Sequence, residues 1–164
     1  MKRSWIISLL AVSFLVLAST ASAQTWTSVA SGGSIRDNSL STYGTSNGLL
    51  NFRFGATGNV HAVYNVTNPM DSGNPSWTTL EFRGQNPGGG LGVSAVAQLI
   101  RQPRFSNSAL TVCSAVLPIG GATTATCTFS ASAIDFANNY YYVQIILGRT
   151  ATTQSVFASG VRLF

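Results

Sequence analysis

The segment at residues 110–129, LTVCSAVLPIGGATTATCTF, contains both cysteines of the chain and a Pro-Ile-Gly-Gly turn at 118–121. Two runs rich in β-branched residues, 109–117 and 123–131, flank this turn, which predicts a pair of antiparallel strands. A turn centred on Gly120 places Cys113 opposite Cys127, at a cross-strand spacing that suits a disulfide. The same register puts both cysteines on the apolar face, so we predict a structural bridge that points into the core. Two separate buried thiols are the alternative.

An export signal is predicted at residues 1–23. It has a basic start at Lys2 and Arg3, an apolar run over 5–17 and small residues at 21–23, so cleavage is expected before Gln24. The apolar run is short for a membrane span, which needs about 20 residues, so we expect no stable membrane insertion after cleavage. The signal resembles a bacterial one in its brevity and cleavage site. A secreted or periplasmic location follows, and such a compartment permits the disulfide.

The charge of the chain is weak once the signal is removed. Residues 24–164 contain seven arginines, no lysine and four acidic residues, for a net charge of +3. The arginines are scattered rather than clustered, so nucleic acid is not an expected partner. The length of 24–164 suits a single domain with a real core.

Alternation of apolar and polar residues recurs along the chain and no segment shows a helical period, which predicts strands. Expected strands cover 49–56, 60–66, 77–83, 91–102, 109–117, 123–131, 140–149 and 155–164, with a further one at 26–30. The first two are expected to form a hairpin. Turn-rich segments at 68–76, 84–92 and 135–139 are predicted loops, as is the polar segment 31–47. The expected inward residues include Phe54 and Phe157.

The fold class predicted by this pattern is all-β. About eight or nine short strands with turns between them are typical of an antiparallel two-sheet sandwich, here with jelly-roll-like connections. An exported chain of this length that ends in Phe164 also resembles small bacterial outer-membrane β-barrels, whose last strand ends in an aromatic residue. In that register Arg162 would face lipid, which is costly, so the sandwich is favoured.

Catalytic chemistry has few candidate residues. His61 is the only histidine, and no nucleophile motif accompanies it, so neither a catalytic triad nor a zinc site is expected. The four carboxylates belong to Asp37, Asp71, Glu81 and Asp135, and only Glu81 lies within a strand. A weak calcium site at Asp71 or Asp135 is conceivable, but neither loop has an acidic cluster. We predict no catalytic residue, no metal and no cofactor.

An aromatic surface is the main functional signal. Tyr140 and Tyr142 should lie on the outer face of their strand, and a final hairpin whose paired positions sum to 304 would set Tyr142 opposite Arg162. Trp77, Glu81, Arg83 and Gln144 are expected on the same face, which then suits stacking on sugar rings or docking of a protein. The alternative is that aromatic residues simply suit strands.

The favoured function is an exported, non-catalytic β-sandwich that binds or structures a partner outside the cytoplasm. The partner would be a glycan, an envelope polymer or another protein. The hypothesis from a different class is a small secreted hydrolase that uses Glu81 with Asp135 or Asp71.

Overall fold

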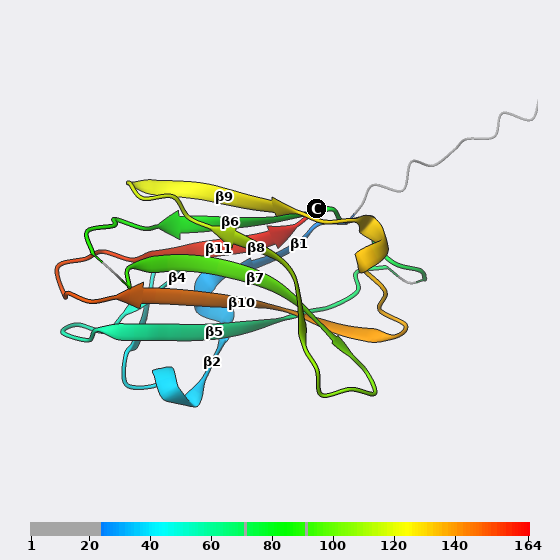
Figure 1. Ribbon diagram of the computed structural model, residues 1–164, viewed down its shortest axis with the longest axis horizontal. Helices are drawn as coiled ribbons and strands as arrows, with labels where there is room; N and C mark the ends of the chain where they lie inside the picture. The colour runs from blue at the N-terminus through cyan, green and yellow to red at the C-terminus, as the bar shows by residue number, and fades with distance from the viewer. Residues whose placement is uncertain (1–23, 71, 91) are drawn as a thin grey trace, which may run out of the picture.

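Two antiparallel sheets pack face to face in the computed structural model, which describes residues 24–70, 72–90 and 92–164 (Figure 1). The predicted signal at 1–23 and Asp71 therefore lie outside the described residues. Within the described ranges there are eleven strands and three short 3-10 helices. No helix in these ranges is both long and apolar enough to span a membrane.

The first sheet, called sheet A here, has the order β3-β4-β11-β6-β9, with β1 also paired to β11. Its strands are β1 (Trp26–Val29), β3 (Tyr43–Ser46), β4 (Leu49–Phe52), β6 (Thr79–Gln85), β9 (Ala122–Thr128) and β11 (Phe157–Leu163). Sheet B has the order β2-β5-β10-β7-β8. Its strands are β2 (Ser34–Ile35), β5 (Gly58–Val66), β7 (Ser94–Pro103), β8 (Leu110–Val116) and β10 (Asn139–Arg149). The predicted antiparallel two-sheet sandwich is thus confirmed.

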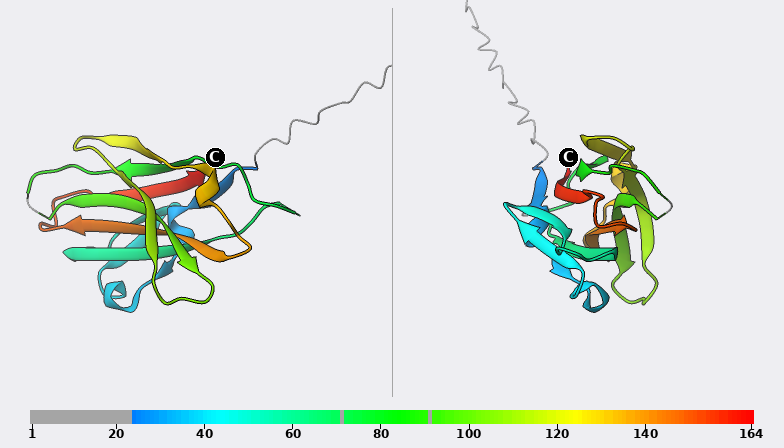
Figure 2. Two further views of the ribbon diagram at one scale, coloured as in Figure 1. Left: turned by 45° about the vertical axis from the view of Figure 1, so that its right-hand side comes forward. Right: turned by 90° about the vertical axis from the view of Figure 1, so that its left-hand side faces the viewer.

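The core fills the space between the sheets, and period-2 alternation determines which side chains enter it. Sheet B contributes the inward residues of β5 and β10 that the sequence predicted, and sheet A contributes those of β4, β6 and β11. The fully or almost fully buried apolar residues include Leu50, Val60, Ala62, Leu80, Phe82, Leu99, Val143, Ile145, Leu147 and Leu163. Figure 2 shows the two layers from two further directions, with the β7–β8 connection projecting beyond the sheets.

Most connections cross from one sheet to the other, so three predicted hairpins are wrong. β4 lies in sheet A and β5 in sheet B, β8 in sheet B and β9 in sheet A, and β10 in sheet B and β11 in sheet A. Cys113 pairs with Leu99 of β7, and Cys127 pairs with Leu80 of β6. The disulfide nevertheless forms, because β8 and β9 are edge strands of facing sheets, and its cysteines pack against the core as predicted.

The segment predicted as a long loop, 31–47, is more regular than expected. It contains the short helices η1 (Ala30–Gly32) and η2 (Asp37–Ser39), together with β2 and β3. β3 and β4 form a hairpin through Asn47 and Gly48, whose φ angles of 50° and 80° are those of a tight type I′ turn. The Asn-Gly pair is the sequence signal for this hairpin.

Two expected inward residues are outward. Phe54 is fully exposed because β4 ends at Phe52, so alternation does not continue to it. Phe157 is only partly buried, whereas Val156 and Ala158 are buried. The register of β11 against β6 shifts between Ala158 and Gly160, and this extra residue changes which positions face the core.

Candidate functional site

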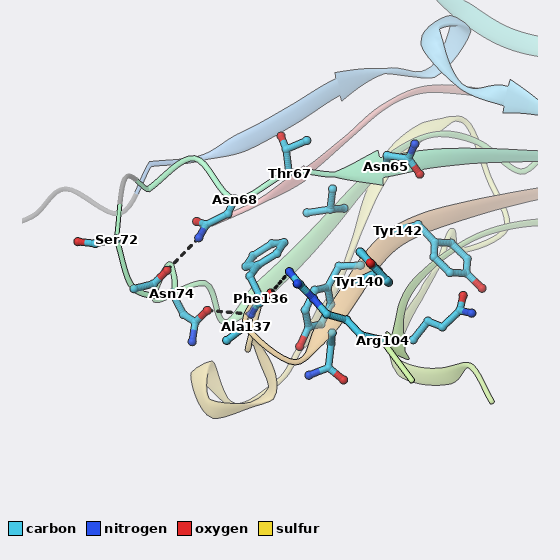
Figure 3. Close-up of a pocket in the computed structure, with 15 residues that line it drawn as sticks. Asn65, Thr67, Asn68, Ser72, Asn74, Arg104, Phe136, Ala137, Tyr140 and Tyr142 are labelled. Atoms are coloured by element: carbon cyan, nitrogen blue, oxygen red, sulfur yellow. Dashed lines mark hydrogen bonds between the residues drawn. The ribbon is translucent and has the colours of Figure 1, made fainter. Parts of the chain in front are cut away.

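A groove of about 830 Å³ lies at the end of sheet B where β10 begins. Its floor comes from β5, β7 and β10, and its walls come from the β5–β6 loop, the β9–β10 loop and the residue that follows β7. The lining residues are Asn65, Val66, Thr67, Asn68, Ser72, Gly73, Asn74, Gln102, Arg104, Phe136, Ala137, Asn139, Tyr140, Tyr141 and Tyr142. We call it the tyrosine groove (Figure 3).

Tyr140 and Tyr142 both reach the outer face of β10, because Tyr141 between them points into the core and is 3% exposed. Tyr140 pairs with Gln102 of β7, and Tyr142 lies opposite Asn65 of β5. Tyr140 is 57% exposed and Tyr142 is half-buried. Their predicted outward orientation is therefore correct, and it gives the groove two aromatic rings.

Arg104 fixes the Tyr140 ring in place. Its guanidinium carbon lies 5.2 Å from the ring centroid, and Nη2 donates a hydrogen bond of 2.8 Å to the carbonyl of Phe136. The backbone N–H of Arg104 also donates to the carbonyl of Asn138 at 3.0 Å. One face of the tyrosine is thus covered by a cation, and the connection after β7 is fastened to the β9–β10 loop.

The β5–β6 loop forms the opposite wall through asparagine contacts. Asn68 Nδ2 donates to the carbonyl of Gly73 at 2.9 Å, and Asn68 Oδ1 accepts from the N–H of Met70 at 3.0 Å. Asn74 Oδ1 accepts from the N–H of Phe136 at 2.9 Å, which ties this loop to the β9–β10 loop (Figure 3). The wall is therefore held by hydrogen bonds across loops that are distant in sequence.

Trp77 supports the groove from below rather than lining it. The sequence placed it on the outer face, but it is fully buried, and its Nε1 donates to the carbonyl of Gln24 at 2.6 Å. Its ring meets the Phe136 ring edge-on with centroids 6.2 Å apart, and Phe136 in turn lies 5.0 Å from the Tyr141 ring. Trp77 is buried contrary to the prediction because it precedes β6, which begins at Thr79. Strand alternation therefore does not apply to Trp77.

Asp135 stiffens the β9–β10 loop. Its carboxylate accepts hydrogen bonds from Asn138 Nδ2 at 2.7 Å and from the N–H of Ala137 at 3.1 Å. The bond from Asn138 is the main reason that the pKa of Asp135 lies below its usual range. The Tyr141 hydroxyl accepts from the N–H of Asp135 and donates to the carbonyl of Ala133. These bonds give Asp135 a structural role.

Glu81, Arg83 and Arg162 do come together, but on the outer face of sheet A, away from the tyrosines. Glu81 Oε1 lies 2.7 Å from Arg83 Nε and 2.9 Å from Arg162 Nε, and Arg162 Nη2 donates to Oε2 at 2.9 Å. Burial alone would raise the pKa of Glu81, but the hydrogen bonds and charges of the two arginines outweigh it and lower this pKa. The predicted pairing of Tyr142 with Arg162 is wrong because β10 and β11 belong to different sheets.

Gln144 lies neither in the tyrosine groove nor beside Glu81. It faces outward from sheet B but is 6% exposed, so the predicted open position is wrong. Its Nε2 lies 3.1 Å from Nδ1 of His61, and its Oε1 accepts from Arg36 Nη2 at 3.3 Å. Burial and then the Arg36 charge lower the pKa of His61. The arrangement is a polar contact between β10, β5 and the segment before η2.

The positions of the carboxylates do not support the hydrolase hypothesis. Glu81 faces outward from sheet A, between two arginines, whereas Asp135 is held in the loop that leads into sheet B, and Asp71 is outside the described residues. A general acid needs a raised pKa, whereas the pKa values of Glu81 and Asp135 are both lowered. The part of the chain that the structure describes contains no cluster of three metal-ligating side chains.

Several groove residues were missed by the sequence reading. Asn68, Asn74, Arg104 and Phe136 lie in loops, and the segment NPMDSGNPS indicates only a turn. Their proximity depends on the strand order, which brings the loops after β5, β7 and β9 to one end of the sandwich.

No protein-family model matches the chain, and no curated protein matches its sequence. The solved structures of similar shape include three binding modules. A carbohydrate-binding module CBM36 in complex with calcium and xylotriose has 14% identity and a TM-score of 0.45, over 86% of this chain and 99% of that one. The CBM36-1 domain of a multidomain xylanase from the hindgut metagenome of Trinervitermes trinervoides has 10% identity and a TM-score of 0.46, over 86% and 97%. The xylan-binding module CBM15 has 17% identity and a TM-score of 0.49, over 85% and 95%.

Proposed function

We propose that the protein is an exported, non-catalytic domain that binds a neutral glycan in the tyrosine groove. The observation that carries this proposal is the exposed Tyr140 ring in a groove whose other polar groups are mainly amides and hydroxyls. Export rests on the signal-like sequence at 1–23 and on the Cys113–Cys127 disulfide, which suits an oxidising compartment.

The chemistry of the groove matches a sugar. A pyranose ring has an apolar C–H face that packs on an aromatic ring, and a rim of hydroxyls that both donate and accept hydrogen bonds. Tyrosine supplies an apolar surface with a polar end, and each asparagine or glutamine side chain offers two donors and an acceptor. Asn65, Asn74 and Gln102 are amides of this kind in the groove.

The charge of the groove favours a neutral ligand over an acidic one. Among its described lining residues Arg104 is the one formally charged side chain, and its guanidinium is already engaged with Tyr140 and with the Phe136 carbonyl. Orientation therefore comes from neutral hydrogen bonds, and aromatic contact supplies much of the affinity.

The test is calorimetric titration of the protein with neutral hexasaccharides of xylose, glucose and mannose. Tyr140→Ala should weaken binding of the recognised sugar at least about tenfold, and Tyr140→Phe should preserve most of it because the ring remains. Phe54→Ala is the control, since it removes a fully exposed aromatic ring that lies outside the groove, in the loop after β4. Unchanged affinity in both Tyr140→Ala and Tyr142→Ala would refute the proposal.

A further inference from the structure

A second hollow, of about 550 Å³, lies on the outer face of sheet A. Its lining comes from β1, β6 and β11 and consists of Thr27, Ser28, Val29, Glu81, Arg83, Ser159, Gly160, Val161 and Arg162. It lies on the opposite sheet from the tyrosine groove and shares no residue with it. Its chemistry is also different, because two of its side chains are cations.

A glycine lies in the lining of this hollow. Gly160 pairs with Arg83 on one side and with Val29 on the other, and it follows the irregularity at Ser159. A Cβ added at Gly160 would lie 3.1 Å from the carbonyl oxygen of Ser28. Gly160 therefore contributes only backbone to the lining beside Arg83.

Glu81 orients both arginines and is itself covered. The side chain of Glu81 is 9% exposed, whereas those of Arg83 and Arg162 are 57% and 40% exposed. Arg162 is further held by the Phe164 ring, whose centroid lies 4.5 Å from its guanidinium carbon. The cluster carries a net charge of +1, and its exposed part is cationic.

Hydrogen-bond donors remain after these contacts. A guanidinium has five N–H groups. Arg83 uses Nε toward Glu81, and its two Nη groups have no hydrogen-bond partner among the described residues. Such a planar pair of donors matches the two oxygens of a carboxylate, and the bidentate pair is stronger and more directional than a contact to lysine.

We propose that this hollow binds the carboxylate of an acidic glycan, a uronate, with Arg83 as the main contact. Hydroxyls of Thr27, Ser28 and Ser159 line the same hollow and suit the hydroxyls of a sugar ring. An acidic peptide is less well matched, because Val29 is the one exposed large apolar side chain in the lining and offers little for peptide side chains. The site is independent of neutral-glycan binding in the tyrosine groove.

The experiment compares tetragalacturonate with its fully methyl-esterified form, which has the same sugar chain without the charges. The protein without the proposed signal, residues 24–164, is titrated with each oligosaccharide at low ionic strength, where charged contacts are least screened. The acid should bind and the ester should bind at least about tenfold more weakly. Arg83→Gln should reduce affinity for the acid by a similar factor, and circular dichroism checks that the variant is folded, because the change also removes one of the two arginine contacts of Glu81.

Arg53→Gln is the matched control. It removes the same charge from an exposed arginine outside the hollow, so affinity should change by less than about twofold. Glu81→Gln removes the resident carboxylate and should strengthen binding of the acid. Tyr140→Ala should leave it unchanged, which separates this site from the tyrosine groove.

Each of the following kinds of result would overturn the assignment. The first is equal loss in Arg83→Gln and Arg53→Gln, which would indicate a general charge effect. The second is binding of the ester as tightly as the acid, or no binding of the acid at all. The third is that hexaglutamate binds as tightly as tetragalacturonate with the same dependence on Arg83, which would assign the hollow to acidic peptides.

Discussion

Cys113, on the edge strand of sheet B, is bonded to Cys127, on the edge strand of sheet A, and their Cα atoms lie 5.9 Å apart. The bond therefore fastens the two sheets to each other at one open side of the sandwich, instead of joining neighbouring strands of a hairpin. The 118–121 turn is the short crossing between the sheets. Separation of β8 from β9 would open the core at this side.

Removal of this bond should destabilise the protein. The cysteines are 14 residues apart, and closing a loop of that size stabilises the folded state by about 3 kcal/mol on the chain-entropy model. Cys113→Ala with Cys127→Ala should lower the free energy of unfolding by about this amount in urea titrations. A reductant should have the same effect on the wild type and none on the double variant. If the urea midpoint were the same for the double variant, the reduced wild type and the untreated wild type, the bond would not hold the sheets together.

Gly84 should not tolerate a side chain. It lies on the inner face of β6, and an added Cβ would be 2.3 Å from the carbonyl oxygen of Phe157 and 3.1 Å from Cδ1 of Leu117. Because the first of these is backbone of the neighbouring strand, Gly84→Ala should cost at least about 1–3 kcal/mol in chemical denaturation. Gly121→Ala is the control, since nothing lies within 4 Å of its added Cβ. Equal stability of the two variants would contradict this packing.

Which side chains enter the core could be predicted from the sequence, because alternation in a strand depends on the backbone alone. Val60, Ala62 and Tyr64 of β5 are buried as expected. The partner of each strand could not be predicted, since a short turn such as 118–121 either closes a hairpin or crosses to the facing sheet. Both outcomes keep the same residues inside, so the apolar pattern does not distinguish them.

In the candidate site too, the facing of strand residues could be predicted and their neighbours could not. The outward positions of Tyr140 and Tyr142 follow from alternation around the buried Tyr141. Their neighbours in the groove, such as Asn74 and Arg104, come from loops that only the strand order brings together. The bulge at Ser159 could not be predicted either, because one extra residue in β11 does not change the composition of the strand. It nevertheless turns Phe157 away from the core.

Two phenylalanines near the end of β4 should differ sharply in their contribution to stability. Phe52 is 7% exposed and lies under the Arg149 guanidinium, 4.6 Å from the ring centroid, whereas Phe54 is fully exposed. Phe52→Ala should cost about 3–5 kcal/mol through the cavity that it leaves. Phe54→Ala should change stability by no more than about 0.5 kcal/mol. Urea denaturation of both variants checks this, and similar losses would mean that β4 continues inward past Phe52.

The Glu81 carboxylate should contribute to stability at neutral pH and lose that contribution in acid. Its folded-state pKa is below that of an unfolded-chain glutamate, about 4.3, because the hydrogen bonds and charges of Arg83 and Arg162 outweigh burial. Because the folded-state pKa is the lower of the two, the unfolded state binds more protons as the pH falls. The stabilisation is therefore fully present above the unfolded-state pKa and disappears as the pH falls through the folded-state pKa.

Glu81→Gln should therefore flatten the acid side of the stability curve. Between about pH 7 and pH 3, the free energy of unfolding of the wild type should fall further than that of the variant, when both are measured by urea titration at each pH. Asp135 also has a lowered pKa, but its contribution is common to both proteins and cancels in the difference. Parallel curves would show that Glu81 is stabilised equally in the folded and unfolded chain, and the paired arginines would then hold the carboxylate in position without favouring its charge.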